Sequence, residues 1–324
     1  MSTNKKKVLI VGPIHEHGMA LLEARDDVTV EVIDTLDPEV IKAHAADAHG
    51  IGVRVAKIDR LVIDNAPNLQ VVSRHGVGYD SVNVEALTER KIPLCIAPRS
   101  NAPSVAEQAM MFMLVHAKQM HVLDPMVRAN DWNRRSEVEA FDLAGRTLLI
   151  CGLGRIGSRL AKRALAFDMK VFGYDPYIDK ETIRAMGVEP VADFRTVLGE
   201  CHMVSVHCPR NKETIGLIGK AEIGALPAGA LVINCARGGI VDEPALLEAV
   251  RSGHVVGAGL DVFDEEPAYD HPFFGERNIL MTPHSAGMSL EARQRSSYQT
   301  VENILAVFDG TLDPDVVVNK EVLA

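Results

Sequence analysis

The glycine-rich segment Gly152-Leu-Gly-Arg-Ile-Gly157 constrains the fold of this chain more than any other feature. It follows an apolar run, Thr147–Cys151, and precedes a helical pattern that begins at Ser158. In such a strand–turn–helix unit the glycines permit a tight turn, a close approach of the backbone to a pyrophosphate, and close packing of the helix on the strand. The helix N-terminus then offers free N–H groups to the phosphates. The segment therefore predicts a dinucleotide-binding domain.

An acidic residue at the end of the next apolar run supports this prediction. Asp175 follows the run Lys170–Tyr174 and lies 18 residues after Gly157. A carboxylate at this point accepts hydrogen bonds from the ribose hydroxyls of a dinucleotide. Its charge also repels the additional phosphate of NADP. We therefore expect NAD as the cofactor; the alternative is a glycine turn that binds no nucleotide.

Composition limits the class of protein. A chain of 324 residues is long enough for two domains, and its net charge of −10 argues against a nucleic-acid-binding surface. The five cysteines are widely and irregularly spaced, which is typical of reduced thiols in the cytoplasm. No apolar run reaches the length of a membrane span, and the run Val8–Val11 after the basic start Met1–Lys7 is too short for a signal peptide. We expect a cytoplasmic protein without nucleic-acid or membrane partners.

The first hundred residues alternate between strand-like and helix-like segments. This alternation predicts a doubly wound parallel sheet of the flavodoxin-like type, because parallel strands need helical crossovers. The expected strands are Val8–Gly12, Val28–Ile33, Ile51–Val55, Leu69–Arg74 and Pro93–Ala97. The expected helices are Gly18–Arg25, Pro38–Ala48, Arg60–Ala66 and Val84–Arg90.

A long helical pattern, Asn101–Met120, separates this region from the glycine-rich segment. Ser104 is the expected cap of this helix. Its methionines Met110, Met111 and Met113 are expected in a core, because the helix is apolar nearly all round. The segment Asp131–Arg135 is expected at the surface.

The alternation resumes after Asp175. The expected strands are Met203–His207, Leu231–Cys235, Gly257–Val262 and Ile279–Thr282, with helices at Pro244–Ser252 and Ser289–Phe308. We therefore expect an α/β protein with two doubly wound parallel sheets. The substrate (catalytic) domain, flavodoxin-like and discontinuous, comprises residues 1–100 and 290–324, and the Rossmann NAD-binding domain comprises residues 101–289. The active site is expected in the cleft between the domains, at the carboxyl ends of the strands.

Three polar residues follow expected strands of the second domain: Arg237, Glu266 and His284. The rigid fork of an arginine binds a carboxylate and an adjacent carbonyl group. A histidine donates or accepts a proton near neutral pH, and a neighbouring carboxylate orients it. Together with a nicotinamide cofactor, these residues suit the reduction of a 2-oxo acid. The alternatives are a surface salt-bridge arginine, a solvated acidic loop and a helix-capping histidine.

Six motifs occur in an order that resembles the D-isomer-specific 2-hydroxyacid dehydrogenases, especially short phosphoglycerate dehydrogenase-like members. They are Arg74–Asp80, Asn101–Glu107, Gly152–Gly157, Asn234–Glu243, Gly259–Pro267 and Thr282–Gly287, and the resemblance covers most of the chain. It implies an NAD-dependent oxidoreductase that interconverts a D-2-hydroxy acid and its 2-oxo acid. Arg237 would be the substrate clamp, His284 the acid/base and Glu266 its partner. A homodimer formed through Asn101–Asp142 is also implied.

The resemblance also implies the binding residues. The loop Gly76-Val77-Gly78 would hold the substrate carboxylate, and Arg54 and Arg74 would contact a second anionic group such as a phosphate. The alternatives are a plain turn and a solvated basic rim. Asp261 would lie near the nicotinamide. The other implied cofactor contacts are Gly152, Gly154, Arg155, Ile156, Gly157, Asp175, His207, Cys208, Pro209, Thr214, Cys235, Ala236 and Gly287.

Two departures and three alternative functions accompany this interpretation. The family often has Leu-Thr where this chain has Arg210-Asn211, which puts cofactor affinity in doubt, and Glu266 in place of glutamine argues against formate as substrate. One alternative is a glyoxylate/hydroxypyruvate or sulfolactate-type reductase. Another, of a different class, is an NAD(H)-sensing corepressor on the same fold. A third is a zinc enzyme using His15-Glu-His17; we expect an exposed loop there and no metal.

Overall fold

The computed structural model describes residues 5–324, which form two units. Unit 1 comprises the chain up to Asn101 together with Met288–Ala324, and unit 2 comprises Ala102–Gly287. The first four residues of the basic start considered above lie outside the described residues. None of the helices within residues 5–324 is both long enough and apolar enough to span a bilayer.

Unit 1 is built on a five-stranded parallel sheet. Its strands are β1 (Lys6–Val11), β2 (Val28–Ile33), β3 (Gly50–Val53), β4 (Val71–Arg74) and β5 (Leu94–Cys95). They are arranged in the order β2-β1-β3-β4-β5. This is the flavodoxin-like order, so the predicted type of sheet is confirmed.

Helices cover both faces of this sheet. They are α1 (Glu16–Glu23), α2 (Pro38–Ala45), α3 (Arg60–Asp64), α4 (Val84–Glu89) and α11 (Leu290–Asp309), with short 3₁₀ helices at Pro314–Val316 and Lys320–Leu323. Alternate residues of β1 enter two cores, because successive side chains of a strand point to opposite faces. Leu9 and Val11 face one core, and Val8 and Ile10 face the other, which α11 also lines.

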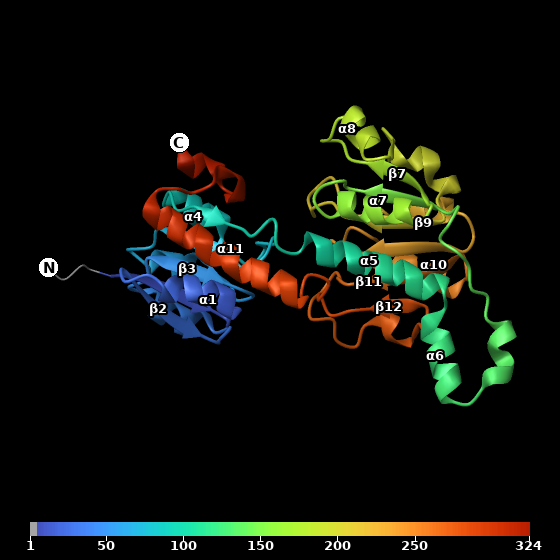
Figure 1. Ribbon diagram of the computed structural model, residues 1–324, viewed down its shortest axis with the longest axis horizontal. Helices are drawn as coiled ribbons and strands as arrows, with labels where there is room; N and C mark the ends of the chain where they lie inside the picture. Colours follow the sequence, from blue (N-terminus) through green and yellow to red (C-terminus); the bar gives the residue numbers. More distant parts are fainter. Residues whose placement is uncertain (1–4) are drawn as a thin grey trace. The chain divides into compact units, whose positions relative to one another are not determined.

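Helices α1 and α11 pack directly against each other in unit 1 (Figure 1). A Cβ atom on Gly18 of α1 would lie 2.5 Å from the carbonyl oxygen of Ser297 in α11. Only glycine fits there, since real Cβ contacts are never so short. This contact packs the start of α1 directly against α11.

Unit 2 contains a seven-stranded parallel sheet in the order β12-β11-β10-β9-β6-β7-β8. The strands are β6 (Thr147–Cys151), β7 (Lys170–Tyr174), β8 (Glu189–Pro190), β9 (Met203–Val206), β10 (Ala230–Asn234), β11 (Val255–Leu260) and β12 (Ile279–Met281). The strand order reverses between β6 and β9, as in a Rossmann fold with one additional strand. The predicted Rossmann class is confirmed.

The helices of unit 2 form two layers. They are α5 (Ala102–Ala117), α6 (Met120–Arg128), α7 (Gly157–Ala166), α8 (Lys180–Ala185), α9 (Lys220–Ala225) and α10 (Glu243–Arg251), with 3₁₀ helices at Trp132–Glu137, Phe194–Glu200 and Pro272–Gly275. Helices α5 and α7 lie side by side (Figure 1) and share a core with Leu148 and Ile150 of β6. Leu149 and Cys151 face a second core with residues of α9 and α10.

The predicted helix over Asn101–Met120 needs correction. It ends at Ala117, because Gln119 adopts a left-handed backbone with φ of 51°, and a second helix, α6, follows. Ser104 is not its cap, because α5 begins at Ala102. Met111 is 39% exposed, so its predicted place in the core is wrong.

Candidate active site

The glycine turn between β6 and α7 has the shape of a phosphate cradle. Gly152 has φ of +95°, and a Cβ on Gly157 would lie 1.9 Å from the Gly152 carbonyl oxygen. A Cβ on Gly154 would instead meet nothing within 4 Å, so space is open beside this residue. Ile156, the cap residue of α7, makes no side-chain hydrogen bond to the first turn. The turn therefore offers both room and N–H donors for a pyrophosphate, with Arg155 between these residues.

Asp175 lies at the end of β7, beside this turn. Its Oδ2 accepts the Leu153 N–H at 2.9 Å, and its Oδ1 accepts the Tyr177 N–H at 3.0 Å. The two backbone bonds fix the carboxylate next to the glycine turn. This is where a dinucleotide presents its ribose.

The loop after β9 forms another wall of the same site. A Cβ on Gly152 would lie 2.7 Å from the Cys208 nitrogen, so this loop touches the glycine turn. Thr214 Oγ1 accepts the Asn211 N–H and donates to the Pro209 carbonyl oxygen at 2.6 Å, which closes the loop. Burial raises the pKa of Cys208 to about 11.

His207 of the same loop is held as a neutral imidazole. Its Nε2 lies 2.8 Å from Ser205 Oγ. Burial lowers the pKa of His207 to about 4. The turn, the fixed carboxylate and this loop together fit a bound dinucleotide.

Arg237, Glu266 and His284 lie on three loops that follow the adjacent strands β10, β11 and β12. His284 Nδ1 lies 2.7 Å from Glu266 Oε2, and Glu266 Oε1 accepts the Phe263 N–H at 3.1 Å. Burial alone raises the pKa of Glu266, but the hydrogen bond to His284 and the charges of His284 and Arg237 hold it below its ordinary value. The ionised carboxylate therefore accepts a hydrogen bond from Nδ1–H of His284, which leaves Nε2 for a substrate.

The loop that carries Arg237 is fixed by its own backbone. Asn234 Nδ2 donates to the Arg237 carbonyl oxygen at 2.9 Å, and Asn234 Oδ1 accepts the Ala236 N–H at 3.0 Å. Arg237 Nη1 donates to the Ala236 carbonyl oxygen at 2.7 Å. A Cβ on Gly238 would lie 1.9 Å from the Phe263 oxygen, so glycine is required for this loop to touch the Glu266 loop.

A chain of polar contacts that the sequence analysis missed joins the same two loops. The Gly239 N–H donates to the Asp264 carboxylate, and the Asp264 N–H donates to Glu243 Oε1 at 2.9 Å. Glu243 Oε2 lies 3.1 Å from His271 Nε2. Burial raises the pKa of Glu243. The doublet Gly238-Gly239 was the available sequence signal, since it marks a close backbone approach.

Asp261 holds the loop that carries His284. His284 has φ of 50°, a left-handed conformation that costs a non-glycine residue free energy. The His284 N–H donates to the Asp261 carbonyl oxygen at 2.8 Å. The Asp261 carboxylate is almost fully buried and accepts the Ser285 N–H at 2.8 Å, the Ala286 N–H at 2.9 Å and the Thr282 hydroxyl at 2.5 Å. Burial raises the pKa of Asp261, against the effect of these hydrogen bonds.

Three further expected cofactor residues lie on the same loops of unit 2. Cys235 and Ala236 directly precede Arg237, and Gly287 follows the residues that Asp261 holds. Burial raises the pKa of Cys235 well above its ordinary value, so its thiol stays protonated.

The expected substrate-binding residues lie together in unit 1. Val53 of β3 and Arg74 of β4 are register partners, so Arg54 and Arg74 occupy neighbouring strand ends. Arg74 Nη1 donates to the His75 carbonyl oxygen at 2.5 Å. Burial, followed by the charges of Arg74 and Arg54, lowers the pKa of His75 to about 4, so its imidazole is neutral near pH 7.

The loop Gly76-Val77-Gly78 follows β4 directly. Gly76 has φ of +131°, a conformation that favours glycine. Its N–H donates to the Arg74 carbonyl oxygen, and its own carbonyl oxygen accepts the Ala97 N–H at 2.8 Å. Unit 1 thus presents two arginines and a glycine loop at one edge of its sheet, while unit 2 brings Arg237, Glu266 and His284 together.

Comparisons with known proteins point to a single family. A family model described as the NAD binding domain of D-isomer specific 2-hydroxyacid dehydrogenases matches residues 110–286. D-3-phosphoglycerate dehydrogenase of Methanocaldococcus jannaschii is 38% identical over 312 residues, which cover 96% of this chain. The chain spans 59% of the length of that relative and similar fractions of other phosphoglycerate dehydrogenases that it matches.

Two further proteins match along their whole length. Glyoxylate reductase of Thermococcus litoralis is 34% identical over 329 residues, which cover 98% of each chain. The structure of D-lactate dehydrogenase of Aquifex aeolicus with NAD and lactic acid is 28% identical, with a TM-score of 0.86, and the match covers 96% of this chain and 99% of that one.

Proposed function

The chain belongs to the D-isomer-specific 2-hydroxyacid dehydrogenase family, and we propose that it interconverts a D-2-hydroxy acid and its 2-oxo acid. Unit 2 contains the family's NAD-binding domain. NAD, when bound, carries the hydride that is added to or removed from the substrate carbon. The glycine turn and Asp175 would hold it.

The observation that carries the proposal is the pairing of His284 with Glu266, on the loops after β12 and β11, next to the loop of Arg237 after β10. During reduction, the guanidinium of Arg237 binds the carboxylate and carbonyl oxygen of the 2-oxo acid and stabilises the charge that develops there. His284 donates its Nε2 proton to that oxygen, and Glu266 stabilises the imidazolium beforehand. In the reverse direction Nε2 accepts the hydroxyl proton.

The proposal is tested by NADH oxidation with a panel of 2-oxo acids: glyoxylate, hydroxypyruvate, phosphohydroxypyruvate, sulfopyruvate and pyruvate. We expect turnover of at least one acid, its loss in His284→Ala, and unchanged turnover in the matched control His44→Ala. His44 also pairs with a glutamate, Glu31, at 2.5 Å, but it lies on α2 of unit 1. NADH binding without turnover of any acid would contradict the proposal and favour the NAD(H)-sensing alternative.

For the substrate, we propose a 2-oxo acid with a second anionic group, such as the 3-phosphoglycerate pair. The two cationic side chains Arg54 and Arg74 at neighbouring strand ends support this proposal. Arg54→Ala should raise KM for phosphohydroxypyruvate at least about tenfold, since charge-assisted bonds contribute about 1.5–3 kcal/mol. KM for hydroxypyruvate should change less. Equal changes, or a preference for glyoxylate or hydroxypyruvate, would favour the second candidate, a reductase like the Thermococcus litoralis relative.

We propose a homodimer formed through the segment Asn101–Asp142. Helix α6 has no buried residue, and Met120, Val127 and Trp132 expose large apolar side chains. Such exposure supports a protein-protein contact there. Light scattering should give twice the chain mass, and Trp132→Glu combined with Val127→Glu should give the monomer.

We also propose a cytoplasmic location. All five cysteines are free, and four of them are buried, which suits a reducing compartment. Fractionation of the source cells should recover the protein with cytoplasmic markers; recovery in a secreted fraction would contradict the proposal.

A further inference from the structure

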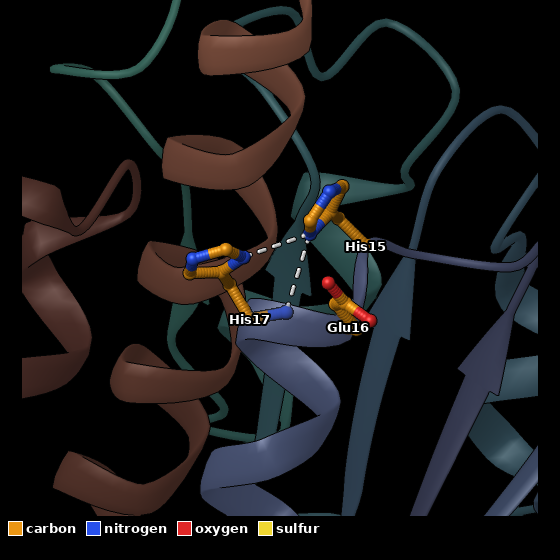
Figure 2. A group of neighbouring side chains, drawn as sticks. All are labelled: His15, Glu16 and His17. Atoms are coloured by element: carbon orange, nitrogen blue, oxygen red, sulfur yellow. Dashed lines mark hydrogen bonds between the residues drawn. The ribbon is translucent and has the colours of Figure 1, made fainter.

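Three side chains capable of binding a metal converge where β1 leads into α1, in unit 1. Figure 2 shows His15, Glu16 and His17, the two imidazole rings facing each other through Nδ1. The two Nδ1 atoms are 3.0 Å apart, and a ligand atom of each of the three residues lies within 4.8 Å of the others. Glu16 thus supplies a third possible ligand beside the two histidines.

The separation of the two nitrogens suits a shared ion. Two imidazole nitrogens bound to one zinc ion at about 2.0–2.1 Å must lie about 3 Å apart at angles between 90° and tetrahedral. The side chain of Glu16 is exposed, and one of its carboxylate oxygens lies within 4.8 Å of a ring nitrogen of each histidine. Two imidazoles and one carboxylate form a ligand set of zinc sites that keep one position open.

The two facing imidazole nitrogens need a proton or a cation between them. At 3.0 Å the two Nδ1 atoms share a proton in an N–H···N hydrogen bond, and a divalent cation can take the place of that proton. His15 Nδ1 also accepts the His17 N–H at 3.2 Å, a bond that a metal would replace and that solvent can satisfy at this exposed helix end. Glu16 in the first turn of α1 offsets the positive end of the helix dipole, which otherwise disfavours a cation.

Contacts with α11 hold the backbone that carries the three proposed ligands in place. The His15 N–H donates to Ser297 Oγ of α11 at 2.8 Å, and the same oxygen lies 3.0 Å from His75 Nε2. Gly18, one residue after His17, touches the backbone of α11. Because the three ligands are consecutive and their helix is anchored, little conformational freedom is lost when they bind an ion.

We propose that His15, Glu16 and His17 form a binding site for one zinc-class divalent ion, with water in the remaining position. The site is independent of the proposed oxidoreductase function, since none of its residues belongs to the proposed substrate or cofactor set. Because the folded chain holds the three ligands together, the ion binds the native state more tightly than the unfolded chain and stabilises unit 1.

The test uses the full chain, stripped with a chelator, and titration with Zn²⁺ by calorimetry and Co²⁺ by absorption. We expect one ion per chain, a Co²⁺ spectrum typical of nitrogen ligation, and a higher Tm with Zn²⁺. His17→Ala and Glu16→Gln should each weaken binding at least about tenfold. The matched control His44→Ala, which removes an imidazole from a single histidine–glutamate pair, should bind as the unchanged protein does.

Three results would overturn the proposal: no saturable binding, an equal loss in His44→Ala and His17→Ala, or unchanged affinity in His17→Ala. Since His17 is exposed, its replacement should leave the fold intact. Circular dichroism checks this, and His17→Gln provides a second variant that retains polarity. An intact variant that still binds one ion normally would refute the site.

Discussion

Asp261→Asn tests whether the buried carboxylate of Asp261 sets the geometry of His284. In the structure, Oδ1 accepts from the Thr282 hydroxyl and the Ser285 N–H, and Oδ2 accepts from the Ala286 N–H. An asparagine has only one oxygen. Its NH₂ group must therefore face a backbone N–H, whichever way the amide turns.

The expected magnitude follows from these contacts. Losing one hydrogen bond to a charged acceptor and leaving a buried donor unpaired costs about 1.5–3 kcal/mol. The left-handed conformation of His284 depends on this support, so we assign the cost to the loop that carries it. At 1.4 kcal/mol per tenfold change, kcat should fall about 10- to 150-fold. The free energy of unfolding should fall by a similar amount.

The assay is steady-state reduction of the best 2-oxo acid from the panel, well below Tm, with NADH affinity measured by fluorescence. A double-mutant cycle with His284→Ala separates positioning from general damage. If Asp261 acts through His284, the double variant Asp261→Asn/His284→Ala should have the same kcat as His284→Ala alone. Additive losses, or a single variant within threefold of the original kcat, would refute the reasoning.

Four other outcomes are expected. His284→Ala should lower kcat for reduction about 10²- to 10⁴-fold while NADH affinity, measured by fluorescence titration, changes little; retained turnover would make His284 structural. Arg237→Lys should lower kcat/KM at least about tenfold, because lysine cannot bind in the bidentate way, and a near-normal value would remove Arg237 from the site. NADH should be preferred to NADPH, since the carboxylate of Asp175 near a phosphate charge costs about 4 kcal/mol before relaxation, and equal kcat/KM values would disprove this. Gly238→Ala should lower Tm in a thermal melt because its Cβ would overlap the Phe263 oxygen, and an unchanged Tm would show that the loops can separate.

The sequence predicted the sheets better than the small helices. All five strands expected in the first hundred residues are present, because each is a short, buried apolar run between turn residues. Helices α8 and α9 have six residues each and β8 has two, too few for a hydrophobic period to be recognised. Helix α6 was missed because the chain turns at Gln119 through a left-handed conformation, which a glutamine does not signal.

The candidate active site also has a part that could be predicted from the sequence and a part that could not. Proximity of Arg237, Glu266 and His284 was predictable, since they follow strands that a Rossmann sheet places side by side. The supporting contacts were not, because they join residues far apart without any period: His271 and Glu243 are 28 positions apart, and Ala286 and Asp261 are 25. The catalytic roles of Arg237, Glu266 and His284 stay predictions until the variants are measured.

The two-segment construction of unit 1 has a consequence for synthesis of the chain. Val301 and Ile304 of α11 complete the core that Val8 and Ile10 begin, yet the whole of unit 2 is translated between them. At ordinary elongation rates of about 5–20 residues per second, the nascent N-terminal sheet waits about 10 to 40 seconds with one apolar face uncovered. Unit 2, being continuous, can fold in that interval. The exposed apolar face of the N-terminal segment is therefore the expected binding site for a ribosome-associated chaperone. Truncation of the chain before α11 should yield an aggregating product rather than a smaller folded protein.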